Sequence, residues 1–378
     1  MTGNRLVAIM LAMAQTPGTA LTKPTAQSRA LGLPPLGTGR VARVLVLVNV
    51  SAGTGHSERL APSFGSTLRD VLGRGSTVEV DTVADHSQVR ARARHFLDLS
   101  DEPAAIVAGG GAGTLRAVVE AVCAESHSAE LPGPDRVRLA ALRLGSGNVV
   151  ARQLGVELDP VAAITGIGAS LRTGVSVPCC VMRCVAGRRD GGSTTHYALT
   201  LCGLGQLGRC AGDLSRWRRR LDGPRAAGAR LVGIERLTQT EYGLAALRRG
   251  VASVVRPSLC EQVRLSIGGR SRDMRLLAGA ALNFPIRWLP EPGVSIGDRA
   301  ITLFLLPHRP RLGRWAVREL VGPRDRVEIE LLDRDSAEFF LDENPERFWS
   351  RLTLEVAGSL AFIPSTGRTV PFATRVSP

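Results

Sequence analysis

Three glycine-rich segments, each directly after an apolar strand-like run, are the residues of this chain best suited to chemistry. They occupy residues 49–55 (Asn-Val-Ser-Ala-Gly-Thr-Gly), 109–114 (Gly-Gly-Gly-Ala-Gly-Thr) and 144–148 (Leu-Gly-Ser-Gly-Asn). Glycine lets a backbone approach a ligand closely, and the amides that open the following helix point at whatever binds there. Three such loops at the carboxyl ends of strands predict a crevice that holds the phosphates of a nucleotide.

The predicted nucleotide contacts all lie within these loops. They are Asn49, Gly53, Gly55, Gly110, Gly111, Gly113, Thr114, Gly145, Ser146, Gly147 and Asn148. The polar side chains among them also suit turns and helix caps, so a local structural role stays open for each of those. Arg116 and Arg152 fall early in the following helices, where they would either neutralise phosphate charge or face solvent.

The order and spacing of the loops resemble those of the diacylglycerol kinase catalytic family, which includes bacterial lipid kinases and sphingosine kinases. Residues 110–114 resemble the Gly-Gly-Asp-Gly-Thr signature of that family, and residues 144–148 resemble its Leu-Gly-Thr/Ser-Gly-Asn signature. The similarity covers residues 41–175 and continues more loosely to residue 363. It implies a kinase that uses ATP and Mg²⁺ to phosphorylate a hydroxyl of a diacylglycerol- or sphingoid-like lipid.

The chain departs from the family at four positions. Ala112 stands where the signature has aspartate, Ala117 replaces a glutamate, and Val50 and Arg143 replace prolines. In the family that aspartate is tied to the nucleotide and its metal, and an alanine can neither hold magnesium nor accept a proton. A pseudokinase that binds nucleotide or lipid without turnover is therefore one alternative, and an NAD kinase-related enzyme is another.

Acidic residues that could replace the lost aspartate lie in the second half of the chain. Asp298 falls where family members carry Asp-Gly before a strand, and Asp342-Glu343 resembles a late Asp-Gly-Glu without its glycine. The resemblance thus implies Asp298 and Glu343 as catalytic residues and Asp298 and Asp342 as metal ligands. Each of the three is also explained as an ordinary turn carboxylate.

The charge of the chain favours anionic partners. Its 378 residues carry a formal net charge of +14, and Lys23 is the only lysine, so a lysine-based P-loop is excluded. Residues 216–220 (Arg-Trp-Arg-Arg-Arg) suit either contact with an anionic membrane surface or a solvated helical face. Because no nucleic-acid reading motif is present and aromatic residues make up only 4%, we expect a lipid partner and no nucleic acid.

The cysteines and the amino terminus bear on where the protein acts. The seven cysteines are odd in number and lie in apolar stretches of the sequence. This indicates buried, reduced thiols in a reducing cytosol. The apolar run 6–14 resembles a short signal peptide, but a tail or an upstream start codon explains it too. We expect a cytoplasmic protein, peripheral at the membrane, whose oligomeric state the sequence does not set.

The pattern along the chain predicts an α/β fold in which a parallel-sheet nucleotide-binding domain precedes a mostly antiparallel β-sandwich domain. We expect a flexible leader at 1–40, the first domain at 41–171 and the second at 172–378. The expected helices are 57–72, 87–97, 115–124, 149–154, 160–171, 213–221 and 235–249. The expected strands are 44–48, 77–83, 104–108, 137–142, 175–185, 196–202, 262–267, 273–282, 300–306, 327–332 and 352–363.

Overall fold

A computed structural model describes most of the chain from residue 41 to residue 365. The described residues are 41–52, 57–125, 131–145, 148–221, 248–249, 251–253, 255–283, 294, 297–309, 316–342 and 344–365. The predicted leader and nearly all of the predicted helix at 235–249 lie outside them. The domain boundaries therefore remain a prediction.

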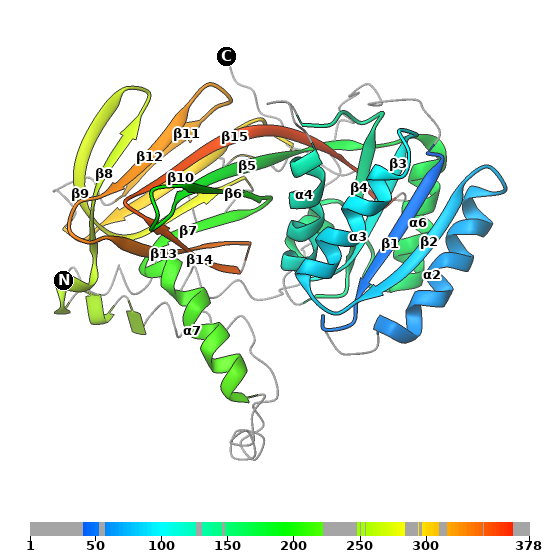
Figure 1. The fold of residues 1–378 in the computed structure, drawn as a ribbon, viewed down its shortest axis with the longest axis horizontal. Helices are drawn as coiled ribbons and strands as arrows, with labels where there is room; N and C mark the ends of the chain where they lie inside the picture. The colour runs from blue at the N-terminus through cyan, green and yellow to red at the C-terminus, as the bar shows by residue number, and fades with distance from the viewer. Residues whose placement is uncertain are drawn as a thin grey trace, which may run out of the picture.

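The first part of the structure alternates strands and helices. Its elements are β1 (Arg43–Asn49), α2 (Ser57–Leu72), β2 (Thr77–Val83), α3 (His86–Asp98), β3 (Ala104–Gly110), α4 (Ala112–Glu125), β4 (Val137–Arg143), α5 (Val149–Gln153) and α6 (Pro160–Thr173). The strands pair in parallel in the order β4-β3-β1-β2. Helices α3 and α4 contact each other, as do α2 and α6, and the two pairs cover the sheet (Figure 1). Because β1 and β3 are buried on both faces, they read as uninterrupted apolar runs.

The second part of the structure is mostly antiparallel. Its elements are β5 (Val177–Gly187), β6 (Ser193–Ala198), β7 (Leu201–Gly205), α7 (Gln206–Leu221), the 3₁₀ turn η2 (Pro257–Leu259), β8 (Glu261–Ile267), β9 (Arg270–Leu282), β10 (Ile301–Pro307), β11 (Val317–Val321), β12 (Arg326–Leu331), β13 (Ser336–Leu341), β14 (Asn344–Trp349) and β15 (Arg351–Phe362). These strands fold around a second apolar core. The predicted α/β fold class, with parallel strands first and antiparallel strands second, is confirmed.

One long strand joins the two parts into a continuous sheet. Strand β15 pairs antiparallel with β5 and β12, and its last residues, Ala361 and Phe362, pair in parallel with β4. The sheet order is β14-β13-β7-β9-β8-β12-β15-β4-β3-β1-β2. Register shifts between Val356 and Gly358, where Gly358 has φ 144, so the strand changes course between the two cores (Figure 1). Strand β15 contributes residues to both apolar cores, a link that the sequence did not indicate.

Three local expectations differ from the structure. The predicted strand 196–202 is two strands, β6 and β7, that break at Leu199 and Thr200. Helix α7 begins at Gln206, seven residues before the predicted start, in a segment whose Gly208 weakens the helical pattern. Strands β11, β13 and β14 were not predicted. Pro345 and the adjacent charged residues Glu346 and Arg347 hide the strand pattern of β14.

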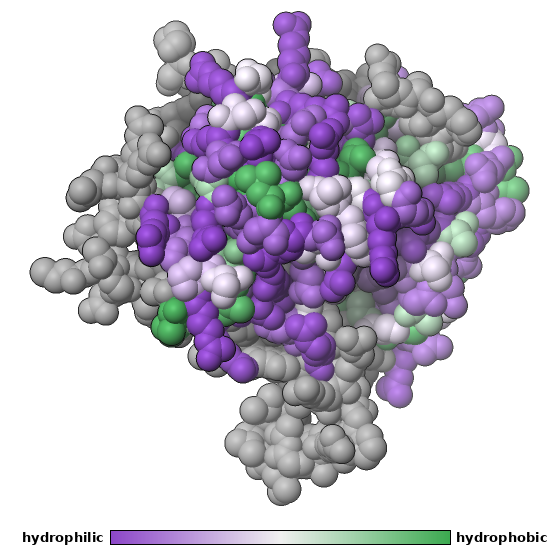
Figure 2. Space-filling model, turned by 60° about the vertical axis from the view of Figure 1, so that its left-hand side comes forward, coloured by the Kyte–Doolittle hydropathy of each residue, from purple (hydrophilic) through white to green (hydrophobic). Residues whose placement is uncertain are grey.

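Helix α7 projects from the antiparallel part of the fold (Figure 1). No helix among the described residues has both the length and the apolar character that crossing a membrane requires. The face that comes forward in Figure 2 is dominated by hydrophilic side chains, with small separate apolar areas. On that face, the described residues offer no broad apolar surface.

Candidate functional site

The order of the parallel strands creates a crevice between β1 and β3. The chain leaves β1 for β2 on one side of it and then returns to β3 on the other side. At such a switch point the loops after the two strands diverge, and ligands of open α/β sheets bind in the space between them. The first and second glycine loops follow β1 and β3, and therefore lie at this place.

A buried hydrogen bond ties the first glycine loop to the second. Asn49, the last residue of β1, donates from Nδ2 to the hydroxyl of Thr114 over 2.9 Å. The other side-chain atom of Asn49, Oδ1, accepts from the amide of Ser51 over 2.9 Å. Both Asn49 and Thr114 are buried. These two hydrogen bonds give the Asn49 side chain a positioning role, holding the two loops in register.

The second and third glycine loops touch each other through their backbones. A Cβ at Gly145 would lie 2.3 Å from the Cα of Gly111, and one at Gly110 would lie 2.3 Å from the hydroxyl oxygen of Thr114. Asn148, at φ 50 in the left-handed region, bonds back to Gly145 through both atoms of its amide group. A side chain at Gly145 would separate the second and third loops, and one at Gly110 would collide with Thr114 of its own loop.

The structure brings seven of the predicted nucleotide contacts to one edge of the sheet. They are Asn49, Gly110, Gly111, Gly113, Thr114, Gly145 and Asn148. Gly53, Gly55, Ser146 and Gly147 lie outside the described residues, as does Glu343. The described residues therefore form a site of converging backbone loops with few functional side chains.

A cavity of about 100 Å³ lies beside the second loop, between the two parts of the fold. Its lining residues come from the glycine loops, from α5 and from the segments 200–201 and 342: Ala108, Gly110, Gly111, Ala112, Leu115, Ala141, Leu142, Asn148, Val149, Val150, Ala151, Thr200, Leu201 and Asp342. The wall is mostly apolar. Ala112 and Asp342 both lie on it, so a carboxylate at residue 112 would enter this space.

The carboxylate of Asp342 is fully engaged by backbone and hydroxyl donors. It accepts from the amides of Leu199, Thr200 and Leu201 over 2.7, 2.9 and 3.1 Å, and from the Thr200 hydroxyl over 2.6 Å. Asp342 is buried and has φ 44 in the turn between β13 and β14. This geometry does not fit the predicted metal ligand. The residue instead fastens the β13–β14 turn to the break between β6 and β7.

Replacing Asp342 by alanine is expected to lower the free energy of unfolding by about 3 kcal/mol or more, because four buried donors lose their acceptor. Denaturant unfolding measures this change. Asp325→Ala is the matched control, since that turn aspartate accepts one backbone amide, from Gly322, and should cost about 1 kcal/mol or less. Equal losses in the two variants would contradict the fastening role.

Asp298 lies in the turn before β10, beside Cys180 of β5. Burial raises the pKa of the Cys180 thiol to about 12, and the nearby Asp298 carboxylate contributes to the increase. Asp298 is half-buried and is not among the residues that line the cavity. The structure therefore does not bring this predicted catalytic residue to the wall beside the glycine loops.

Two side chains that the sequence did not indicate lie against the second loop. A Cβ at Gly113 would be 2.6 Å from Cε1 and 2.7 Å from Nε2 of His86, and 3.3 Å from Nδ2 of Asn344. Asn344 begins β14, where it pairs with Leu341 of β13, and it lies beside the second loop. A predicted β13–β14 hairpin would have revealed this.

Arg116 is buried in a network that links α4 to β14 and β6. Its Nη2 lies 2.8 Å from both Glu120 and Glu346 and donates to Nδ1 of His196 over 3.2 Å. Burial lowers the pKa of Arg116, but the two glutamates outweigh it and leave the pKa raised. Its charge is thus neutralised within the protein. Arg116 serves to hold the two parts of the fold together at the site.

The described residues do not provide a site for a protein-held magnesium ion. They contain no group of three or more His, Cys, Asp or Glu side chains arranged to hold a metal. At the second loop itself, residue 112 is alanine and Asp342 is already saturated by donors. Proteins usually hold Mg²⁺ through one or two carboxylates together with substrate phosphates and water, and the described residues at this loop offer no uncommitted carboxylate.

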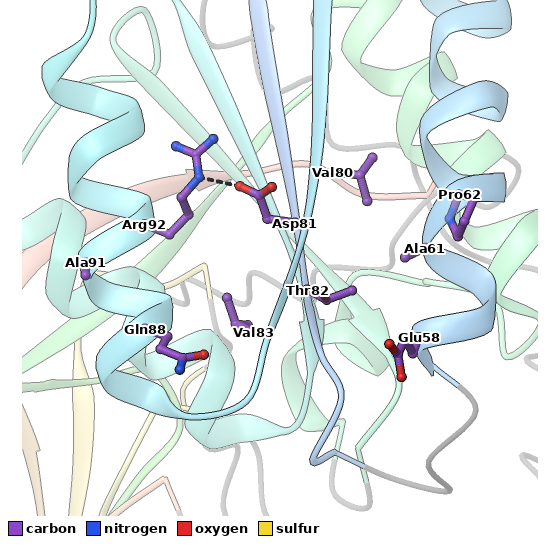
Figure 3. A pocket seen from close by; sticks show the side chains of 10 residues that line it. All are labelled: Glu58, Ala61, Pro62, Val80, Asp81, Thr82, Val83, Gln88, Ala91 and Arg92. Atoms are coloured by element: carbon purple, nitrogen blue, oxygen red, sulfur yellow. Dashed lines mark hydrogen bonds and ion pairs between the residues drawn. The ribbon is translucent and has the colours of Figure 1, made fainter.

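A second, open hollow of about 980 Å³ runs along the outer edge of β2 (Figure 3). Its walls are α2 and α3, and its residues are Glu58, Ala61, Pro62, Val80, Asp81, Thr82, Val83, Gln88, Ala91 and Arg92. Arg92 reaches from α3 to bond Asp81 on β2, and also pairs with Glu79. No glycine-loop residue lines this hollow, so it is separate from the β1–β3 crevice.

Comparison with known protein families supports the resemblance that the three glycine loops indicate. Residues 43–178 match the diacylglycerol kinase catalytic domain. The resemblance predicted from the glycine loops is therefore confirmed for this part of the chain. The matched diacylglycerol kinase catalytic region contains β1 to β4 and all three loops. No curated protein gives a significant match to the sequence.

Solved structures of diacylglycerol kinase-like proteins resemble this chain in its antiparallel second part as well as in its parallel first part. A diacylglycerol kinase from Bacillus anthracis str. Sterne is 14% identical, with TM-score 0.54, and the alignment covers 87% of this chain and 98% of that one. A second structure from the same strain has TM-score 0.58 at 14% identity, covering 87% and 97% of the two chains. At this identity the likeness shows the shared fold.

Proposed function

We propose that this protein is a lipid kinase that transfers the γ-phosphate of ATP to a hydroxyl of a diacylglycerol- or sphingoid-like lipid. The observation that carries the proposal is the convergence of the loops after β1, β3 and β4: Asn49 bonds Thr114, and Gly145 packs on the backbone of Gly111. Together with the family match of residues 43–178, it supports a phosphate-binding edge of the kind that this family uses.

Backbone groups supply most of the proposed phosphate binding. The amides of Thr114 and Leu115 bond the Gly111 carbonyl, which leaves those of Ala112 and Gly113 at the start of α4 for phosphate, at the positive end of the helix dipole. The missing side chain at Gly111, whose Cβ position has no atom nearer than 3.8 Å, leaves room for phosphate oxygens to approach these amides. The lipid hydroxyl would reach the γ-phosphate from the side of the β13–β14 turn.

Phosphoryl transfer mainly requires positioning, charge neutralisation and a proton acceptor for the attacking hydroxyl. In this chain Asn49 and Thr114 position the loops, while the helix start supplies positive potential. Because the described residues do not fit a protein-held Mg²⁺, we route no step through such an ion.

The direct test incubates purified protein with γ-labelled ATP and a mixed lipid extract, followed by separation of the lipids. The proposal predicts a labelled lipid whose formation depends on the intact protein. The Gly145→Ala variant serves as the control, since it disturbs the loops without altering any ionisable group. Absence of labelled lipid across diacylglycerols and sphingoid bases would refute the proposed kinase activity.

A pseudokinase is the second candidate, and one observation favours it. Ala112 stands where the family has aspartate, and the Asp342 carboxylate is already held by four donors of the protein. This candidate predicts that calorimetry will detect ATP binding although no phosphate is transferred. Transfer by the natural protein would exclude it.

We further propose that the arginines of α7 bring the protein to an anionic membrane surface. Arg216 is exposed and pairs with Asp213, and Arg249 pairs with the same carboxylate. The side chains of residues 217–220 lie outside the described part. Each basic residue near an anionic surface contributes about 1 kcal/mol of attraction.

Replacing Arg216 and Arg218–Arg220 by serine is therefore expected to weaken binding to anionic vesicles by about 100-fold or more at low salt. Vesicle co-sedimentation measures the loss, and added salt should reproduce it in the natural protein. The control removes four exposed arginines of the antiparallel sheet: Arg270, Arg272, Arg324 and Arg326. If both variants lose binding equally, net charge alone accounts for the attraction.

A further inference from the structure

His86 lies against Gly113 of the second glycine loop. It is the first residue of α3, directly after the β2 edge of the parallel sheet, and Asp85 caps the helix before it. Its ring fills the space that a side chain at Gly113 would need, with Cε1 and Nε2 within 2.6 and 2.7 Å of that Cβ position. Asn344 approaches the same glycine from β14 at 3.3 Å. The ring therefore lies against the proposed phosphate loop.

The surroundings of His86 keep its imidazole neutral at physiological pH. Burial lowers the pKa of His86, and the nearby cations Arg90 and Arg116 lower it further, against smaller opposite effects of Glu120 and Asp85. Asn344, which faces the loop from β14, carries no charge. Among the described residues, no hydrogen bond to either ring nitrogen is formed. A neutral imidazole with an available lone pair is a proton acceptor.

The carboxylates around His86 are committed to other partners. Glu120 pairs with Arg90 and Arg116, and Glu346 pairs with Arg116. Asp85 accepts from the amide of Gln88 and from the Ser87 hydroxyl at the start of the helix. Hydrogen bonds that stabilise a carboxylate make it a poor base, because they favour its ionised form. Among the described groups beside Gly113, His86 alone remains suited to take a proton.

We propose that Nε2 of His86 accepts the proton of the attacking lipid hydroxyl, an inference that rests on the proposed kinase function. The hydroxyl oxygen forms a bond to the γ-phosphorus as its O–H bond breaks and the proton passes to Nε2. The bond from the γ-phosphorus to the β–γ bridging oxygen breaks, and ADP leaves with that electron pair. The imidazolium then returns its proton to solvent, and Asn344 orients the hydroxyl beside the ring.

The test compares His86→Gln with the natural protein, using labelled ATP and the lipid that the natural protein phosphorylates. Glutamine keeps the size and a hydrogen-bonding group but cannot act as the base. We expect kcat to fall about 100-fold or more while the affinity for ATP changes less than about three-fold. His95→Gln is the matched control, since His95 lies at the exposed far end of the same helix, and it should keep full activity.

The pH profile separates a chemical role from a structural one. Because only neutral His86 accepts a proton, kcat of the natural protein should fall as pH drops through the pKa of His86, below about 6.5. This limb should vanish in His86→Gln. A variant that loses activity uniformly at every pH, with the limb retained, would show a structural role and overturn the proposal.

A readout independent of turnover is the NMR titration of the His86 ring, assigned from the signal lost in His86→Gln. Its pKa should lie below the ordinary value for histidine, and a non-hydrolysable ATP analogue should raise it, because added phosphate charge favours the imidazolium. An unresponsive ring would overturn the proposal. If the natural protein binds the analogue but transfers no phosphate, the kinase function fails and this step fails with it. If His86→Gln transfers phosphate as fast as the natural protein, the proposed proton transfer to His86 is refuted, while the kinase function stands.

Discussion

Replacing Gly145 by alanine is expected to abolish nucleotide binding and to lower the free energy of unfolding by about 1–3 kcal/mol. The added methyl carbon would lie 2.3 Å from the Cα of Gly111, 2.9 Å from its amide nitrogen and 3.1 Å from the Gly110 carbonyl oxygen. All three are backbone atoms, which cannot swing away as a flexible side chain could. The second and third loops must therefore separate, and the phosphate site between them is lost.

Two further alanine variants give this prediction its controls. Gly133→Ala adds a methyl group with no atom within 4 Å, so both stability and ATP binding should be unchanged. Gly111→Ala meets only the Gly145 Cα, at 3.8 Å, so it should fold normally and weaken ATP binding only by crowding the ligand. Calorimetry and thermal unfolding measure both quantities. Normal ATP affinity in Gly145→Ala would show that these loops do not form the nucleotide site.

Introducing a carboxylate at residue 112 is expected to have the largest effect on turnover. Ala112 opens α4 on the wall of the cavity that Asp342 also lines. An aspartate there would sit beside the phosphates, where a negative charge is favourable only when a metal ion accompanies it. We expect Ala112→Asp to raise kcat for lipid phosphorylation by about ten-fold or more and to make ATP affinity depend on Mg²⁺.

Parallel assays with and without Mg²⁺ test this second prediction, with Ala112→Asn as the isosteric variant that lacks the charge. The asparagine variant should gain neither activity nor magnesium dependence. An inactive natural protein paired with an active Ala112→Asp variant would identify a pseudokinase and refute the proposed kinase activity. Equal ATP affinity with and without Mg²⁺ in Ala112→Asp would show that this residue does not face the phosphates.

The parallel part of the fold could be predicted from the sequence because its signals are local. Each of the strands β1, β3 and β4 is a short apolar run, and each is followed by a loop that needs glycine. The helices between them carry their own periodicity, as the amphipathic α2 does. Periodicity and loop chemistry therefore fix both the elements and their order, and the crevice follows from the order.

The groups that complete the site could not be predicted because they depend on contacts between distant segments. Asp342 looks like an ordinary turn aspartate, and only the fold brings the amides of 199–201 to its carboxylate. The same holds for His86, whose neighbour Gly113 lies on another helix, and for Asn344 on β14. The sequence offers Arg116 as a residue that could neutralise phosphate charge. In the structure it instead donates to Glu346, which lies 230 residues away in the chain.

The claim that the glycine loops form the nucleotide site is tested most directly by NMR of ¹⁵N-glycine-labelled protein during titration with a non-hydrolysable ATP analogue. The account predicts that the resonances of Gly110, Gly111, Gly113 and Gly145 shift with one common affinity. Gly65, which packs against Val80 beside the β2-edge hollow, should not move. Shifts at Gly65 with unchanged loop resonances would place the nucleotide in that hollow and contradict the account.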